Sequence, residues 1–125
     1  MELTQTYLLV SDVEASAAFY ETVLDLSVAE RSDERVAFQT GECELVVEED
    51  FDEDTFSAFG LRPPGEDRGR GAFFVFDVAD VDAVYDRAVE WGATVPTEPR
   101  TVDWGRKICL VEDPDGYVLE VGRPL

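Results

Sequence analysis

One carboxylate stands where the sequence otherwise predicts a buried strand. The stretch DPDGYVLEV, residues 113–121, begins with residues typical of a tight turn and continues as an apolar strand. Glu120 lies between Leu119 and Val121 in that strand. A carboxylate among aliphatic side chains costs free energy unless a cation, a metal or a hydrogen-bond donor compensates it. Glu120 is therefore the first candidate for a functional residue.

The sequence contains no histidine, so acid–base chemistry would fall to carboxylates or tyrosines. Glu44, in the apolar run CELVV, and Asp77 join Glu120 as candidates. Two facing carboxylates in a dry cavity can share a proton, which raises the pKa of one of them into a useful range. No phosphate-binding loop, dinucleotide-binding glycine motif or nucleophile elbow competes with them. Glu44 and Glu120 are thus the candidates for catalysis.

The elements that would position these carboxylates occur twice. YLLVSDVEA, which starts at residue 7, matches VFDVADVDA, which starts at residue 75, and each predicts a strand that leads into a helix. Ser11 and Glu14 have the spacing of a capping box at the first helix. Asp80 is the predicted N-cap of the second helix and Gly92 its C-cap.

Three strand-like runs follow each predicted helix. They are LSVAER, RVAFQT and CELVVEE in the first half, and ATVPTE, RKICLVE and YVLEVG in the second. The chain is therefore predicted to be one α+β domain, residues 1–125, with two βαβββ modules. Module one covers about 1–49 and module two about 72–125, joined by a linker, 50–71, in which DEDTFSAFG predicts a short helix. A half of this size cannot cover both faces of its sheet, so two halves or two copies must pair.

The duplicated units, with FYETVLDL in the first helix and WGR and DPDGYVLEV near the end, resemble the vicinal oxygen chelate superfamily. That superfamily contains glyoxalase I, extradiol dioxygenases, fosfomycin-resistance enzymes and bleomycin-binding proteins. The resemblance covers the chain except for the linker, and the acidic composition resembles haloarchaeal members. The resemblance implies that the two modules form cupped mixed sheets. It implies this fold more specifically than the activity, because the superfamily hosts several chemistries and some pure binders.

The resemblance also implies four metal positions, one on the first and one on the last strand of each half. Histidine is usual on the first strand and glutamate on the last. Carried over by position, these places hold Gln5, Glu44, Phe73 and Glu120. Phenylalanine cannot bind a metal, and the other three offer oxygen ligands that suit magnesium, calcium or manganese better than zinc. Two interpretations stay open: a degenerate divalent-metal site, or carboxylates on a wet wall paired with an arginine such as Arg106. We favour the site without metal or other cofactor.

Strand alternation predicts which side chains share the cavity wall. Aromatic rings mixed with a few carboxyl and amide groups are typical of a small-molecule pocket. Trp104 lies in a predicted turn, where it would line the pocket mouth, cap a partner subunit or be half-buried. The candidate ligand-binding residues are Gln5, Tyr7, Glu44, Phe73, Val75, Trp104, Arg106 and Glu120.

The charge excludes some partners. With 29 acidic and 10 basic residues the net charge is −19, which repels nucleic-acid phosphate and anionic membranes, so neither is an expected partner. The acids are spread along the chain, which favours adaptation to a salt-rich cytoplasm over nucleic-acid mimicry. No apolar run approaches a membrane span, and Cys43 and Cys109 lack metal or redox spacing, so we expect a cytoplasmic protein.

Three function hypotheses follow from these observations. The first is a metal-independent protein, expected to be a homodimer, that binds a small molecule in its cup. The second is a lyase, isomerase or dioxygenase-like enzyme, of the glyoxalase type, with a degenerate metal site. The third is an acidic adaptor or nucleic-acid mimic that uses only its surface. The sequence leaves the ligand's identity open.

Overall fold

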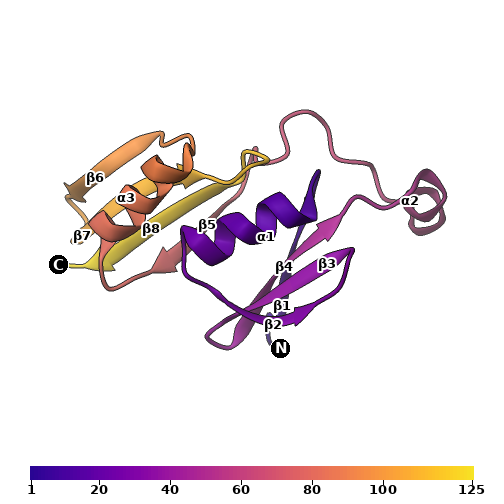
Figure 1. The fold of residues 1–125 in the computed structure, drawn as a ribbon, viewed down its shortest axis with the longest axis horizontal. Helices are drawn as coiled ribbons and strands as arrows, with labels where there is room; N and C mark the ends of the chain where they lie inside the picture. The colour runs from indigo at the N-terminus through magenta and orange to yellow at the C-terminus, as the bar shows by residue number, and fades with distance from the viewer.

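The computed structural model describes residues 1–125 and contains eight strands and three helices in two matching halves (Figure 1). The first half consists of β1 (Gln5–Val10), α1 (Val13–Thr22), β2 (Ser27–Arg31), β3 (Arg35–Thr40) and β4 (Cys43–Glu49). The linker carries the short helix α2 (Glu53–Phe59). The second half consists of β5 (Phe73–Asp77), α3 (Val81–Trp91), β6 (Thr97–Val102), β7 (Arg106–Glu112) and β8 (Val118–Pro124). The predicted α+β class with two βαβββ modules is confirmed.

Each half folds into its own four-stranded mixed sheet. The strand order is β1-β4-β3-β2 in one sheet and β5-β8-β7-β6 in the other. The first and last strands of each half run parallel, and the remaining pairs are antiparallel. The parallel pairing is possible because the helix carries the chain back across one face of the sheet. It sets Gln5 opposite Glu44 and Val75 opposite Glu120.

The helix-covered faces of both sheets share one core. Along β1, Leu8 and Val10 are buried on this side while Gln5 and Tyr7 point the other way, as a strand's alternation requires. The core cluster draws on α1, α3 and both sheets, and α1 lies in the middle of the molecule (Figure 1). Phe19 of α1 meets Trp91 of α3 edge to face, with ring centroids 5.8 Å apart. Neither helix covers the opposite faces of the sheets.

Two local predictions are corrected. The N-cap of α1 is Asp12, whose carboxylate accepts the N–H of Ala15 at 3.1 Å, and not Ser11, whose hydroxyl bonds to the other half of the chain. The strand predicted at ATVPTE instead occupies residues 97–102, because Ala93 and Val95 pack against the core as the chain leaves α3. The predicted caps of α3 and the short linker helix are confirmed.

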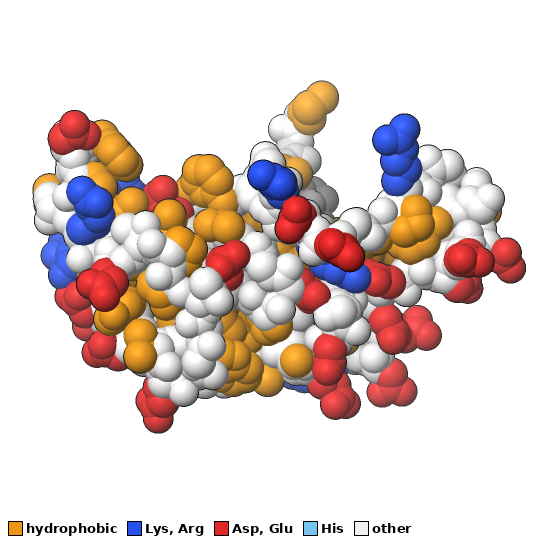
Figure 2. Space-filling model, turned by 90° about the horizontal axis from the view of Figure 1, so that it is seen from above, with side chains coloured by type: hydrophobic (Ala, Val, Ile, Leu, Met, Phe, Trp, Pro, Cys, Tyr) orange, Lys and Arg blue, Asp and Glu red, His pale blue; other side chains and the backbone are white.

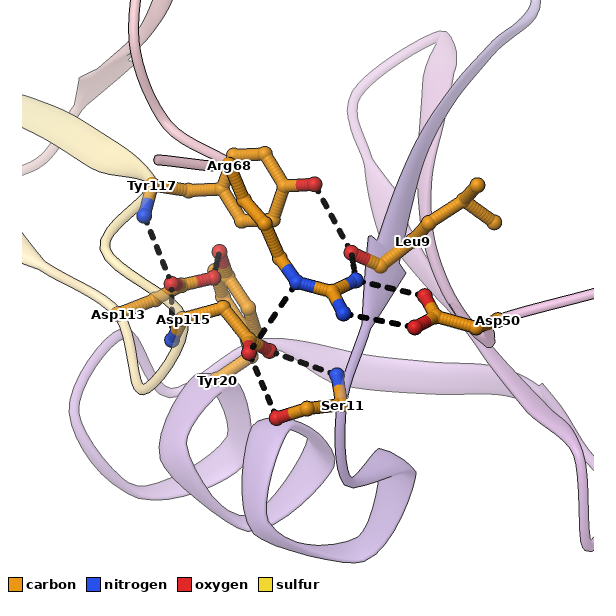
Figure 3. A network of polar contacts seen from close by, with 8 residues as sticks. All are labelled: Leu9, Ser11, Tyr20, Asp50, Arg68, Asp113, Asp115 and Tyr117. Carbon is orange, nitrogen blue, oxygen red and sulfur yellow. Dashed lines mark hydrogen bonds and ion pairs between the residues drawn. The ribbon is translucent and has the colours of Figure 1, made fainter. Parts of the chain in front are cut away.

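A polar network joins the two halves, and we call it the junction: Leu9, Ser11, Tyr20, Asp50, Arg68, Asp113, Asp115 and Tyr117 (Figure 3). The Arg68 guanidinium lies at its centre and makes two parallel bonds to Asp50, at 2.6 and 2.7 Å. It also donates to the backbone carbonyl of Leu9 at 3.0 Å. Asp115, 3.8 Å from the Arg68 Nε, accepts from the N–H and the hydroxyl of Ser11, at 3.1 and 2.6 Å. The linker and both halves therefore meet at one arginine.

The turn between β7 and β8 supplies the other side of the junction. The buried Asp113 carboxylate accepts from the backbone N–H groups of Asp115 and Tyr117, each at 2.9 Å, and from the Tyr20 hydroxyl at 2.7 Å. Burial raises the pKa of Asp113, and the hydrogen bond from Tyr20 opposes the rise. The pKa of Tyr20 is also raised, first by burial and then by the charge of Asp113. The turn is thus tied to α1 before β8 begins.

Removing the Tyr20 hydroxyl should destabilise the fold. Tyr20→Phe leaves a buried Asp113 oxygen without its donor, and the free energy of unfolding should fall by about 1–3 kcal/mol. Denaturant titration measures the change. Tyr85→Phe, which removes a hydroxyl outside the junction, is the control and should shift the midpoint much less. Equal effects from the two variants would contradict this role for the junction.

Asp113 should also make stability depend on pH. Its folded-state pKa lies above the ordinary value of 3.8, so its stabilising contribution is complete below that pH and is lost as pH rises through the folded-state pKa. Asp113→Asn keeps the shape but cannot titrate. The free energy of unfolding of the variant, relative to wild type, should therefore increase with pH over this interval. Paired urea titrations of the two proteins over about four pH units, from pH 3 to 7, measure how this difference in unfolding free energy changes with pH. A difference that stays constant or falls as pH rises would contradict the prediction.

Candidate functional site

The first open face is the side of the β1-β4-β3-β2 sheet that no helix covers. It carries Gln5 and Tyr7 from β1, Glu44 from β4 and Arg35 from β3. The amide of Gln5 donates to the Glu44 carboxylate at 2.9 Å, across directly paired positions. The Tyr7 side chain is 46% exposed although it lies near the middle of its strand. This face therefore offers an aromatic ring beside amide, carboxyl and guanidinium groups.

The second open face is the corresponding side of the β5-β8-β7-β6 sheet. Phe73 and Val75 of β5 are 59% and 56% exposed there, which is unusual for large apolar side chains on a strand. Glu120 is half-buried on the same face, between Val75 on β5 and Leu110 on β7. Glu120 has no hydrogen-bond or ion-pair partner in the structure, so nothing in the chain compensates its carboxylate.

The four positions that the resemblance implies do not meet in one chain. Glu44 lines a groove of about 580 Å³ together with Phe73 and Val75, between β5 and the end of the first sheet where β3 turns into β4. Glu120 is not among the residues that line this groove. No group of three or more histidine, cysteine, aspartate or glutamate side chains is arranged to hold a metal ion. The structure thus pairs Gln5 with Glu44 and leaves Glu120 apart.

The donor groups do not fit the metal that this kind of fold commonly holds. Phe73 has no donor atom, and the Gln5 amide is already engaged with Glu44. Glu44 and Glu120 lie on different open faces, and no group of three or more acidic or cysteine side chains gathers around either of them. We therefore derive no chemical step through a metal at these positions.

Arg106 and Trp104 lie at the far end of the second open face. Arg106 does not pair with Glu44 or Glu120; its guanidinium bonds to Asp77 on β5. Trp104 is 64% exposed in the turn between β6 and β7, before Gly105, whose φ of 83° suits a glycine. A wall role for Trp104 stays a prediction, because the side chain extends into solvent at the edge of the sheet.

Sequence reasoning missed Arg35. Its guanidinium donates to the Tyr7 hydroxyl at 3.0 Å and lies 5.6 Å from the centroid of the Tyr7 ring. The repeat held a signal that could have found it: Arg35 and Arg106 are each the first residue of the third strand in their half. Each arginine reaches across the neighbouring strand to the first strand of its half.

The cysteines offer no nucleophile of the usual activated kind. Both are free, and burial raises the pKa of the Cys109 thiol to about 11, so it stays protonated near neutral pH. Cys43 lies 3.9 Å from the Thr6 hydroxyl, with no base beside it. The open faces are therefore equipped for recognition by contact, with carboxylates and the Tyr7 phenol as their acid–base groups.

The acidic residues are not confined to one end of the side of the molecule that Figure 2 shows. Figure 2 shows carboxylates over the visible side of the molecule, with the densest group at the end that carries α2. That end holds the run EEDFDED, residues 48–54. No helix is long and apolar enough to cross a membrane.

Known proteins share both sequence and fold with this chain. Uncharacterized proteins of Mycobacterium bovis and Mycobacterium tuberculosis are 42% identical over 48 residues, which is 38% of this chain. The match spans only 32% and 28% of the length of these curated relatives.

Solved structures match over the whole length. A protein of unknown function from Agrobacterium tumefaciens is 26% identical, with a TM-score of 0.82, and the match covers 100% of this chain and 95% of that one. A glyoxalase/bleomycin resistance protein/dioxygenase family enzyme from Burkholderia phytofirmans, 21% identical, has the same fold, with a TM-score of 0.82 and complete coverage of both chains.

The family comparison agrees with the architecture described above. The family model of the Glyoxalase/Bleomycin resistance protein/Dioxygenase superfamily matches residues 2–121, that is, both halves and the linker. The chain belongs to that superfamily.

Proposed function

We propose that the protein binds a small organic molecule on its open faces without a metal ion. The observation that carries this proposal is the pair of open faces, where Tyr7, Phe73 and Val75 are exposed beside a few polar groups. Such a mixture is typical of small-molecule sites. The broken donor set supports the metal-independent form of the proposal, because Phe73 and the engaged Gln5 occupy two of the four ligand places.

We propose further that the protein is a homodimer in which a second copy covers these faces. Each sheet buries only its helix-covered side, and large apolar side chains stay exposed on the other side. Exposed apolar faces of this kind favour association. A cup closed by two copies would also exclude water from a bound ligand, which strengthens every polar contact inside.

Two other functions are less well supported. A metal-dependent lyase, isomerase or dioxygenase-like enzyme would need donors that the open faces do not gather. An acidic adaptor or nucleic-acid mimic would need its carboxylates concentrated on one surface, and Figure 2 shows them widely spread. The spread agrees better with a cytoplasmic, salt-adapted protein, since solvated carboxylates on all sides keep such a protein dispersed.

Small aromatic probes test the binding function. Benzoate, benzamide and benzylamine share one ring and differ in charge, and each is titrated into ¹⁵N-labelled protein pretreated with EDTA. At least one of them should perturb the NMR resonances of Tyr7 or Trp104, and readdition of magnesium or manganese should not tighten the binding. Light scattering on the same sample gives the molar mass.

Three results would contradict the proposal. If no probe perturbs either open face, the small-molecule function fails. If binding disappears on EDTA treatment and returns with metal, the metal-dependent enzyme replaces it. A molar mass near 13.9 kDa, that of one chain, would exclude the homodimer.

Glu120→Gln tests whether this carboxylate meets a cation. Glu120 has no partner in the chain, so the variant removes one charge from a surface of 29 acidic and 10 basic residues. The melting temperature in dilute buffer should stay unchanged or rise slightly, and the difference should vanish in molar potassium chloride, where the Debye length is about 3 Å. Added magnesium or manganese should change the melting temperatures of wild type and Glu120→Gln by the same amount. If a divalent cation stabilises wild type but not Glu120→Gln, the result supports the degenerate metal site instead.

A further inference from the structure

Arg35 is a weakly neutralised cation in a very acidic protein. The protein has 10 basic and 29 acidic residues, and five of the other nine basic residues form an ion pair, as Arg68 does with Asp50. The carboxylate nearest to Arg35 within ion-pair range is Glu30, at 3.8 Å, and its side chain is 76% exposed. An exposed pair at this separation contributes little free energy.

The surroundings of Arg35 leave donors unused. One terminal nitrogen, Nη2, donates to the Tyr7 hydroxyl at 3.0 Å, and Nη1 has only the distant Glu30. The Nε atom is buried without any partner, as is the Nε atom of Arg106. Glu48 lies directly opposite Arg35 across the β3–β4 pair, yet the two form no ion pair, because Arg35 leans toward Tyr7. A guanidinium has five N–H donors in a planar fork, and most of those of Arg35 lack a close acceptor.

The second half of the chain provides an internal comparison. Arg106, the counterpart of Arg35 at the start of the third strand, bonds directly to Asp77 on the first strand of its half. In the sequence repeat Leu9 corresponds to Asp77, so the first half has no carboxylate at that place. The corresponding arginine side chain therefore contacts a carboxylate in the second half and a phenol in the first. The charge of Arg35 stays available to a ligand.

The geometry around Arg35 suits a flat ligand. To reach Tyr7 on β1 from β3, the side chain crosses β4, which lies between them, at the level of Val46. Val46 and its neighbour Ala37 are fully covered, although they belong to the open face. The guanidinium lies over the Tyr7 ring, 5.6 Å from its centroid, and Tyr7 is 46% exposed.

We propose that Arg35 and Tyr7 recognise the anionic group of the ligand, and that the ligand is an aromatic carboxylate. The proposal rests on the proposed small-molecule function and names its ligand class. The guanidinium fork matches a carboxylate in two parallel hydrogen bonds, and the exposed ring accommodates an apolar body. The surrounding carboxylates do not prevent the binding of an anion at high salt. In 1 M salt the Debye length is about 3 Å, so only charged groups in direct contact with the ligand contribute to its selection.

The test uses benzoate, benzamide and benzylamine in 1 M potassium chloride with the full chain. Wild type, Arg35→Gln and Arg62→Gln are compared; Arg62 lies exposed in the linker with no ion pair, so both variants lose one positive charge. Benzoate should bind wild type more tightly than the other two probes do. Arg35→Gln should raise its Kd by about tenfold or more, the loss expected for a charge-assisted pair, and Arg62→Gln should leave it unchanged.

A second measurement does not depend on the folding of a variant. In wild-type protein labelled with ¹⁵N at the arginine side chains, benzoate should shift the Arg35 Nε–H resonance and leave that of Arg62 in place. Tyr7→Phe should weaken benzoate binding less than Arg35→Gln does, because it removes a neighbour of the cation and keeps the charge.

The outcomes separate this proposal from the function on which it rests. Equal benzoate affinity in wild type and Arg35→Gln, or benzamide or benzylamine binding at Tyr7 as tightly as benzoate, overturns the carboxylate class while small-molecule binding stands. If none of the three probes perturbs Tyr7, Trp104 or Arg35, both proposals are overturned. Loss of benzoate binding in both charge variants would show a general charge effect and would also overturn the role of Arg35.

Discussion

The turn between β7 and β8 constrains the whole molecule, because it is tied to the first half before the last strand begins. Asp113 accepts a hydrogen bond from the Tyr20 hydroxyl, and Asp115 accepts one from Ser11 (Figure 3). Arg68, which pairs with Asp50 in the linker, contacts Leu9 in the first half and Asp115 in the second. Buried charged groups are tolerated only when they are paired and hydrogen-bonded, and each of these groups has its partners. The junction therefore holds the two modules in the arrangement observed.

That arrangement decides which faces are free for function. With α1 held between the halves, both sheets direct their helix-covered sides to a common core, and their other sides stay open. Glu44 and Glu120 lie on different open faces for this reason. Their places in the two sheets also differ, because Glu44 pairs with Gln5 whereas Glu120 pairs with Val75, the repeat counterpart of Tyr7. The geometry that stabilises the single chain thus divides the site between its two halves.

Most of the fold could be predicted because period-two patterns and turn residues are local signals. RVAFQT, CELVVEE and RKICLVE are strands with the predicted bounds. The N-cap of α1 could not be predicted reliably, because Ser11 and Asp12 both qualify and a contact with Asp115, distant in sequence, decides between them. The separation of Glu44 from Glu120 was equally hidden, since it follows from how two modules pack.

The two open faces differ in their side chains although the two halves have the same order of strands and helices. An arginine begins the third strand of each half and crosses to the first strand in both. The partner differs: Asp77 neutralises Arg106, whereas Tyr7 orients Arg35 without cancelling its charge. Both arginines lie on the open faces, away from the core that the two sheets share, so the difference changes the charge of a face and leaves the core contacts in place. The two halves can therefore differ in the charge of their open faces although they pack against the same core.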